Sequence, residues 1–205
     1  MITVAALYVD PDGVYAGQPG VELWDEARDA RRYDGPHRVV AHPPCSPWSY
    51  LAPLIQSRYG HQIGDDRGCF ASALAAVRRW GGVLEHPAGS RAWATFGLPR
   101  PSRWHGWTRE LFDPGWSCEV SQRAYRHRAT KLTWLYAVVP GVPPELDWSR
   151  PEPIATVSFL TNRGGGDLPR LPKREARATP PEFRDALLCI ARSVARKQPE
   201  LRDLT

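Results

Sequence analysis

Two short apolar runs, Arg38-Val39-Val40-Ala41 and Val83-Leu84-Glu85-His86-Pro87, enclose a helical pattern in the middle of the chain and decide its fold. Pro43 and Pro44 follow the first run. Because a residue before proline avoids helical backbone, we expect a strand over 38–41 that ends at a loop carrying Cys45. The second run predicts a strand over 82–85, which also ends at a proline-bearing loop.

Between the two runs, the sequence predicts a helix over 66–80 that Asp65 caps and Gly81-Gly82 ends. Its apolar face consists of Phe70, Leu74, Val77 and Trp80. Strands joined by such a crossover are normally parallel, so both proline-bearing loops should open at one sheet edge, where α/β proteins bind their ligands. The expected fold class is α/β: a Rossmann-like, methyltransferase-like, mainly parallel sheet of about five to seven strands with flanking helices.

The flanking segments extend this sheet. Residues 2–9 predict a strand, and the turn signal Asp10-Pro11-Asp12-Gly13 predicts a hairpin with a second extended run at Val14-Tyr15. Residues 20–24 form another short apolar run, and 131–139 predict a strong strand. Segments 96–118 and 160–178 are expected to be irregular, basic loops.

Near the C-terminus, Thr179-Pro180-Pro181-Glu182 matches a capping box, which predicts the start of a helix. The buried face of that helix would carry Phe183, Ala186, Leu187, Ile190 and Val194.

Composition predicts one domain over 1–205, since 205 residues with 42% hydrophobic content suffice for one core. The net charge of +5 and the nine Trp suit a polyanionic partner with bases that stack on flat rings. Four widely spaced cysteines without a C-x-x-C pair favour reduced thiols in a cytoplasm. The first residues resemble neither a secretion signal nor a membrane span, so we expect a soluble cytoplasmic protein.

The Pro-Pro-Cys loop indicates a nucleophile, because a turn after a strand projects the Cys45 thiol outward. Glu85, at the end of the neighbouring strand, is the candidate general acid. Attack on C6 of a pyrimidine needs this pairing: the thiolate adds to C6 while an acid protonates or hydrogen-bonds N3. The base must also leave the helical stack.

Two metal-dependent alternatives use the same residues. His42, Cys45 and His86 would meet if the two loops do, which leaves a metal site open. A zinc base deaminase is disfavoured, because Trp48 stands where its second cysteine would be.

The segment Pro43-Pro44-Cys45-Ser46-x-Trp48-Ser49 resembles the Pro-Cys motif of the cytosine-C5 DNA methyltransferases. Glu85-His86-Pro87 stands where that family has Glu-Asn-Val, and the stretch from Gln122 to Arg128, followed by strand 131–139, is similar to its Gln-x-Arg segment. The likeness covers about 38–140. The Ala-His-Pro-Pro-Cys and Glu-His-Pro-Ala-Gly segments also resemble those of small phage-encoded proteins with no assigned activity.

This resemblance implies a transferase that modifies a flipped pyrimidine in DNA. Its catalytic residues would be Cys45, Glu85, His86 and Gln122. Its cofactor, S-adenosyl-L-methionine, would contact Asp25, as the acidic ribose ligand, and Pro43. The nucleic acid would contact Ser46, Trp48, Arg123, Tyr125, Arg126, His127, Arg128 and Lys131.

The chain departs from the family at three points. The glycine-rich cofactor loop after the first strand is missing, Glu-Asn-Val has become Glu-His-Pro, and Ala124 replaces the arginine of Gln-x-Arg. The donor therefore stays open between S-adenosyl-L-methionine and another group donor. Two other functions also stay open: a non-catalytic DNA-binding relative, and a cysteine- or metal-dependent enzyme acting on nucleotides. A solvated basic face with buried tryptophans is the alternative to a DNA-binding groove.

Overall fold

The computed structural model describes residues 3–49, 52, 62–102, 106–157 and 168–193. Its helices and strands are, in chain order, β1 (Val4–Leu7), β2 (Val21–Trp24), η1 (Ala30–Arg32), β3 (Arg38–Ala41), η2 (Ser46–Trp48), α2 (Cys69–Trp80), β4 (Gly82–Pro87), α3 (Arg91–Thr95), β5 (Thr108–Arg109), β6 (Trp116–Ser121), η3 (Gln122–Tyr125), β7 (Leu132–Val138), α4 (Lys173–Arg177) and α5 (Pro181–Arg192).

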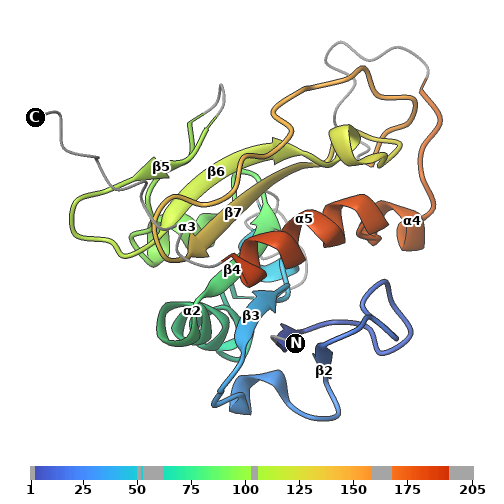
Figure 1. The fold of residues 1–205 in the computed structure, drawn as a ribbon. Coiled ribbons are helices and arrows are strands. Elements are labelled where there is room, and N and C mark those ends of the chain that lie inside the picture. The colour runs from blue at the N-terminus through green and yellow to red at the C-terminus, as the bar shows by residue number, and fades with distance from the viewer. Residues whose placement is uncertain (1–2, 50–51, 53–61, 103–105, 158–167, 194–205) are drawn as a thin grey trace, which may run out of the picture.

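The strands form one mixed sheet in the order β2-β1-β3-β4-β7-β6-β5 (Figure 1). Its first four strands are parallel, with Val40 opposite Val83 across β3 and β4. β7 is antiparallel to both β4 and β6, so β6 runs in the same direction as β4. The expected α/β class and the parallel crossover from β3 through α2 to β4 are thus confirmed. The expectation of a mainly parallel sheet is wrong, because β5, β6 and β7 join it through antiparallel pairs.

Helices cover both faces of the sheet, with α2 on one side and α5 on the other (Figure 1). Alternate residues of each strand serve the two cores because successive side chains point to opposite faces. Val39 and Leu84 pack in the cluster that contains α2, whereas Val40 and Val83 pack in the cluster that contains α5. Every residue of β1 is buried, as expected for a parallel strand covered on both faces.

The start of β4 requires a glycine. Gly82 has a φ of 119°, and a Cβ placed there would lie 1.9 Å from the carbonyl oxygen of Val39. Only glycine adopts this backbone conformation and allows this close approach of β3 without strain.

The predicted N-terminal hairpin is wrong. The turn at Asp10–Gly13 exists, with Gly13 N donating to Asp10 O, but Val14-Tyr15 forms no strand. Tyr15 is instead buried in the core beneath α5, and the chain returns as β2 in parallel with β1. The apolar run at 20–24 competes successfully for this edge of the sheet because its residues pair with the whole length of β1.

Helix starts also differ from the sequence predictions. α2 begins at Cys69, and Asp66 rather than Asp65 accepts hydrogen bonds from the backbone N–H groups of Gly68 and Phe70. α5 begins at Pro181 after Pro180 with no side-chain cap, so the capping box predicted from Thr179 does not form. Phe183, Leu187 and Ile190 are buried as predicted, Ala186 is partly buried, and Val194 lies outside the described residues.

The two segments expected to be irregular contain regular structure. β5 and the start of β6 lie within 96–118, and α4 lies within 160–178. Residues 103–105 and 158–167 lie outside the described part of the chain. Among the helices that the structure describes, none combines the length and the apolar character that crossing a membrane requires.

Candidate functional site

Three loops meet at one edge of the sheet. The parallel strands β3 and β4 end there, and β7 begins there because it runs in the opposite direction. Pro87 at the end of β4 pairs with Thr133, and Gln122 N, just after β6, donates to Lys131 O. The structure therefore brings the Cys45 loop, Glu85 and the 122–131 segment to the same edge, as the crossover predicted for the first two.

The Glu85 carboxylate is the centre of this site. His42 Nδ1 lies 3.1 Å from Glu85 Oε2, and Gln122 Nε2 lies 3.3 Å from Glu85 Oε1. The Glu85 side chain is 14% exposed, so the carboxylate is largely buried but still reaches the surface. One donor follows β3 and the other follows β6, and together they fix both carboxylate oxygens.

The hydrogen bonds continue on both sides of Glu85. Tyr15 OH lies 2.9 Å from His42 Nε2, and Gln122 Nε2 also donates to Thr133 Oγ1 at 2.9 Å. A carboxylate only accepts, so His42 Nδ1 must carry a proton; in the neutral ring, Nε2 then accepts from Tyr15 OH. Burial keeps that hydroxyl protonated, because it raises the pKa of Tyr15 well above its ordinary value.

Glu85 is ionised at neutral pH. Burial alone would raise the pKa of Glu85, but the hydrogen bond and charge of His42 outweigh it, with help from Lys131 and His86. The net direction is a lowered pKa. In the resting protein this side chain is therefore a hydrogen-bond acceptor.

The pKa of the Cys45 thiol is shifted in the opposite direction, upward from its ordinary value. Cys45 lies exposed at the start of η2, yet partial desolvation and the negative charge of Glu85 raise the pKa of its thiol. The positive charges of Arg177 and Lys131 act in the other direction. Since these charges act on the sulfur, Glu85, Lys131 and Arg177 all lie within electrostatic range of Cys45.

Lys131 is fixed in place beside the thiol. Its Nζ donates to the carbonyl oxygens of Arg177, at 3.1 Å, and Ala178, at 2.7 Å, at the C-terminal end of α4. Its backbone is left-handed, with a φ of 38°. Burial lowers the pKa of Lys131, whereas Glu85 and Cys45 raise it. The cation is thus positioned by backbone groups and acts on the thiol through its charge.

His86, predicted to be catalytic, lies on the other face of the sheet from Glu85. It is 1% exposed, its Nδ1 lies 2.7 Å from Ser90 Oγ, and its ring packs between Phe70 and Trp93. Its Nε2 makes no well-aligned hydrogen bond among the described residues, although the Pro44 carbonyl acts on the ring. Desolvation lowers the pKa of His86 to about 4, so the ring is neutral at pH 7. Through the Pro44 carbonyl it supports the loop that carries Cys45.

Most residues predicted to contact nucleic acid have partners inside the protein. Trp48, Tyr125 and His127 are buried, and Trp48 Nε1 donates to Asp66 at 2.8 Å. The arginines Arg123, Arg126 and Arg128 bond to Glu152 O, Glu182 and Glu175, respectively. Ser46 is exposed beside Cys45. The Trp48 indole therefore forms a wall of the core beneath the loop.

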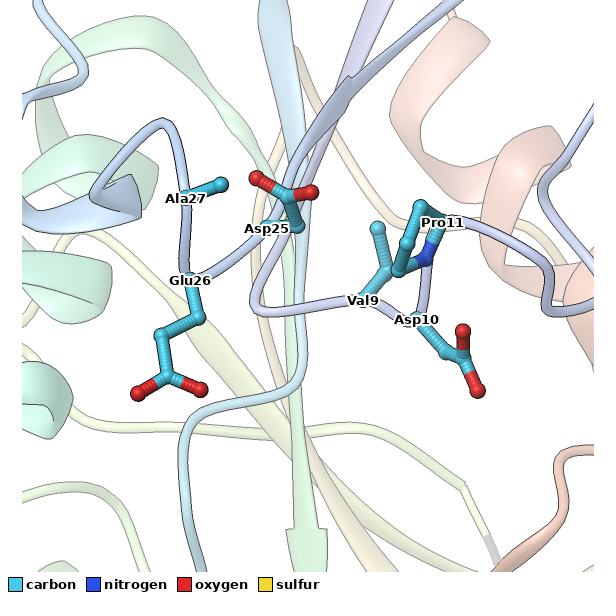
Figure 2. Close-up of a pocket in the computed structure, with 6 residues that line it drawn as sticks. All are labelled: Val9, Asp10, Pro11, Asp25, Glu26 and Ala27. Carbon is cyan, nitrogen blue, oxygen red and sulfur yellow. The ribbon is translucent and has the colours of Figure 1, made fainter.

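An open depression lies at the ends of β1 and β2 and has a volume of about 520 Å³ (Figure 2). It is lined by Val9, Asp10, Pro11, Asp25, Glu26 and Ala27. Asp25, predicted as a cofactor ligand, is in this lining, and one of its oxygens accepts from Arg28 N at 2.9 Å. Pro43, the other predicted cofactor contact, is buried at the start of the Cys45 loop and is not part of the lining.

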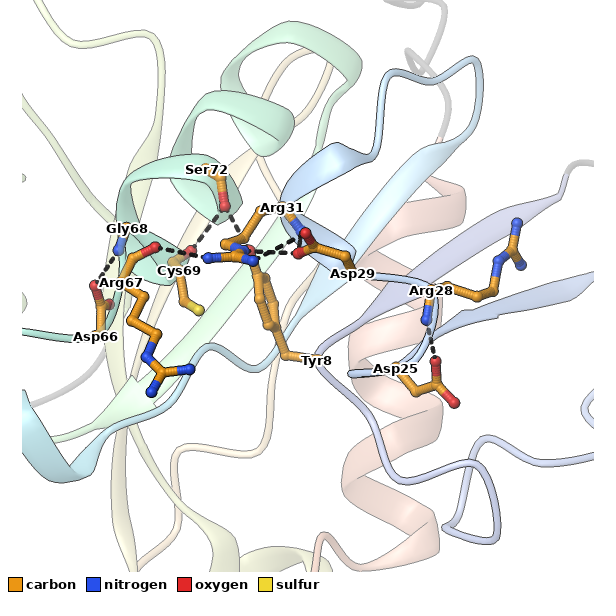
Figure 3. Close-up of polar contacts among 10 residues, drawn as sticks. All are labelled: Tyr8, Asp25, Arg28, Asp29, Arg31, Asp66, Arg67, Gly68, Cys69 and Ser72. Carbon is orange, nitrogen blue, oxygen red and sulfur yellow. Dashed lines mark hydrogen bonds and ion pairs between the residues drawn. The ribbon is translucent and has the colours of Figure 1, made fainter.

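A polar network connects the end of β1, η1 and the start of α2 (Figure 3). Tyr8 OH bonds to Ser72 Oγ of α2, and Arg31 of η1 pairs with Asp29 and donates to Arg67 O at 3.3 Å. Burial raises the pKa of Tyr8 to about 12, so its hydroxyl stays protonated. These groups are hydrogen-bonded to one another, so the network holds η1 against α2 and has a structural role.

The sequence interpretation missed Tyr15 and Thr133 and considered His42 only as a metal ligand. A signal for His42 was present: it follows Val40 by two residues, as Glu85 follows Val83, so both side chains lie on the α5 side of the sheet. In the part of the chain that the structure describes, no three His, Cys, Asp or Glu side chains are grouped to hold a metal ion.

Comparisons with protein-family models, with curated proteins and with solved structures find no match for this chain.

Proposed function

We propose that this protein is a Rossmann-like, cytoplasmic enzyme that modifies a flipped pyrimidine of DNA, with Cys45 as the nucleophile at C6. The observation that carries the proposal is the Glu85 carboxylate, fixed by His42 and Gln122 at a sheet edge beside the exposed Cys45 thiol. Ligands of α/β sheets bind outside the carboxyl ends of the strands, which is where these groups lie. The four free cysteines agree with a reducing compartment.

The protonation states of Cys45 and Glu85 in the resting site supply the one proton that the proposed addition needs. A raised pKa keeps the proton on Cys45, and a lowered pKa keeps Glu85 ionised. Moving that one proton from the sulfur to the carboxylate creates a thiolate and a carboxylic acid. The thiolate adds to C6, the C5–C6 double bond breaks, and the acid protonates or hydrogen-bonds N3, so that C5 becomes nucleophilic.

Positive charge assists the thiolate. When the proton leaves Cys45, negative charge develops on sulfur, and the fixed ammonium of Lys131 stabilises it without reorganising. Gln122 contributes by orienting Glu85, because its amide nitrogen donates to both Glu85 and Thr133.

The depression at the ends of β1 and β2 fits a group donor that carries a nucleoside. Carboxylates such as those of Asp10, Asp25 and Glu26 accept hydrogen bonds from ribose hydroxyls, and Val9 and Pro11 offer an apolar surface to a base. The three acidic side chains favour a cationic donor. S-adenosyl-L-methionine meets both requirements and, when bound, would supply a methyl group for C5.

A trapping experiment tests the proposal. The purified protein is incubated with DNA carrying 5-fluorocytosine or 5-fluorouracil and with S-adenosyl-L-methionine or other group donors. Fluorine at C5 cannot leave as a proton does, so the covalent adduct should persist on a denaturing gel. We expect an adduct with the wild type and with Cys189→Ser, whose thiol is exposed on α5, and none with Cys45→Ser.

The alternatives give other results. Tight DNA binding with no adduct under any donor would indicate the non-catalytic DNA-binding relative. An adduct that survives Cys45→Ser would refute the assignment of the nucleophile.

A further inference from the structure

The cations of the 122–128 segment are largely engaged within the protein. Arg126 pairs with Glu182 at 3.1 Å, Arg128 pairs with Glu175 at 3.2 Å, and Arg123 Nε donates to a carbonyl oxygen at 2.9 Å. A phosphate that bound these arginines would have to compete with the carboxylates. This segment, although rich in arginine, therefore offers little uncompensated positive charge.

The short helix α4 differs in this respect. Lys173, Arg174 and Arg177 are exposed, and none of their side chains has a hydrogen-bond or ion-pair partner among the residues that the structure describes. Positions 173, 174 and 177 share one side of a helix, since residues four apart lie one above the other. The acidic residue of α4, Glu175, is turned to Arg128 instead. We call the three side chains the α4 cationic face.

α4 is anchored to the candidate site. Leu171 and Ala176 pack with Ala129 and Ala155 in a small apolar cluster. The Lys131 ammonium binds the carbonyl oxygens at the helix's C-terminal end, where a cation is favoured. The helix α4 is thus attached to the segment 129–131, which contains Lys131.

The α4 cationic face also lies within electrostatic range of the nucleophile. Among the charged side chains that lower the pKa of the Cys45 thiol, Arg177 has the largest effect, ahead of Lys131. A polyanion bound to α4 would therefore act on the charge of the Cys45 thiol and would contact the helix that Lys131 holds.

We propose that the α4 cationic face binds the phosphate backbone of the DNA strand whose base reaches Cys45. Unpaired, exposed guanidinium and ammonium groups are the groups that release counterions from DNA, whereas paired ones are already compensated. The choice of DNA rests on the proposed function. The surface itself rests on the charges and contacts of α4.

Salt-dependent DNA binding tests this surface. The affinity for a short fluorescein-labelled duplex is measured by fluorescence anisotropy between ~50 and ~200 mM salt. Each lost phosphate contact lowers the slope of log affinity against log salt by about 0.9. For Arg174→Ala/Arg177→Ala we expect a slope smaller by roughly two. Alanine favours helix, and neither side chain makes a contact that the helix would lose.

Two control variants remove the same charge elsewhere. Arg79→Ala/Arg109→Ala removes arginines of α2 and β5, and Arg126→Ala/Arg128→Ala removes the paired arginines of the 122–128 segment. In both variants we expect the slope to change by less than about 0.9, the value for one phosphate contact. An unchanged slope in the α4 variant, or a larger change in either control, would overturn the proposal.

The adduct assay separates this proposal from the enzymatic one. If wild type forms the Cys45 adduct but the α4 variant keeps its slope, only the surface is refuted. If the slope falls in the α4 variant but no adduct forms, the surface is supported and the chemistry is not. Salt-insensitive binding by the wild type would refute the surface, whereas the adduct decides the chemistry.

Discussion

His42 Nδ1 lies 3.1 Å from Glu85 Oε2, so the residue that follows β3 and a residue near the end of the neighbouring parallel strand β4 share a hydrogen bond. The contact follows from the register of β3 and β4, in which Val40 is opposite Val83 and the side chains two residues later lie on the same face. It gives a buried carboxylate the donor that it needs, and it fixes where Glu85 points.

Removing His42 should destabilise the protein in a pH-dependent way. In His42→Ala, the buried Glu85 carboxylate loses its main donor, which typically costs about 3 kcal/mol at pH 7. In the wild type the lowered pKa of Glu85 contributes stability above the ordinary carboxyl pKa, and that contribution is lost as the pH falls. The difference between wild type and variant should therefore shrink as the pH falls below the ordinary carboxyl pKa of 4.5, as urea unfolding measures.

A double-mutant cycle checks the cause of this loss. Glu85→Gln removes the charge but retains the shape, so His42→Ala/Glu85→Gln should be destabilised by less than the sum of the two single variants. Additive losses would show that His42 stabilises the protein through contacts other than Glu85.

The reactivity of Cys45 should move in opposite directions when the two neighbouring charges are removed. Glu85→Gln removes a charge that raises the thiol pKa, so alkylation by iodoacetamide near pH 7.5 should become faster. Lys131→Met removes a charge that lowers it, so alkylation should become slower. A shift of one pKa unit changes the thiolate fraction about tenfold below the pKa, and we expect effects of roughly three- to tenfold.

Peptide mass spectrometry measures these rates at Cys45. The exposed thiol of Cys189 on α5 serves as a reference in the same molecule. Changes of the same sign in both variants would contradict the electrostatic account and indicate altered access to the thiol.

His86 should make the protein less stable in acid. Its pKa is about 4 in the folded protein, below the ordinary value of 6.5. Between these values the unfolded chain binds a proton that the folded chain does not, so stability falls as the pH decreases through this window. From pH 7 to pH 5, this one group accounts for a loss of about 2 kcal/mol.

The comparison variant is His86→Leu. It should be less stable than the wild type at pH 7, because Ser90 loses its partner, but it should lose about 2 kcal/mol less on going to pH 5. Equal losses in both proteins, measured by urea unfolding, would mean that His86 is not the buried neutral group described above.

The sequence predicts the centre of the fold well because local signals agree there. Apolar runs, a helical pattern and glycine and proline at the ends of elements indicate β3, α2 and β4, and the crossover rule then places Cys45 and Glu85 at one edge. The position of Tyr15 is not predictable in this way. The turn after Asp10 favours a hairpin locally, whereas the observed burial of Tyr15 under α5 depends on a helix far along the chain.

The charges around the site are similarly hidden from local inspection. Arg126 and Arg128 belong to a conspicuous basic stretch, but their partners, Glu182 and Glu175, lie about fifty residues away. A count of arginines therefore overstates the positive potential of 122–128. It also understates that of α4, where the only carboxylate is turned to Arg128.

No short fragment of this chain contains the whole candidate site. Because β7 is antiparallel to β4, its start brings Lys131 to the same end of the sheet as residues from much earlier in the chain. Tyr15, Cys45, Glu85, Lys131 and Arg177 reach one edge of the sheet from segments spread over most of the sequence. Pairings between such distant segments form slowly, because closing long loops costs entropy before the contacts are made. During synthesis the Cys45 thiol therefore emerges long before Lys131 and Arg177, so the two cations that favour its thiolate join the site only after nearly the entire molecule has been assembled.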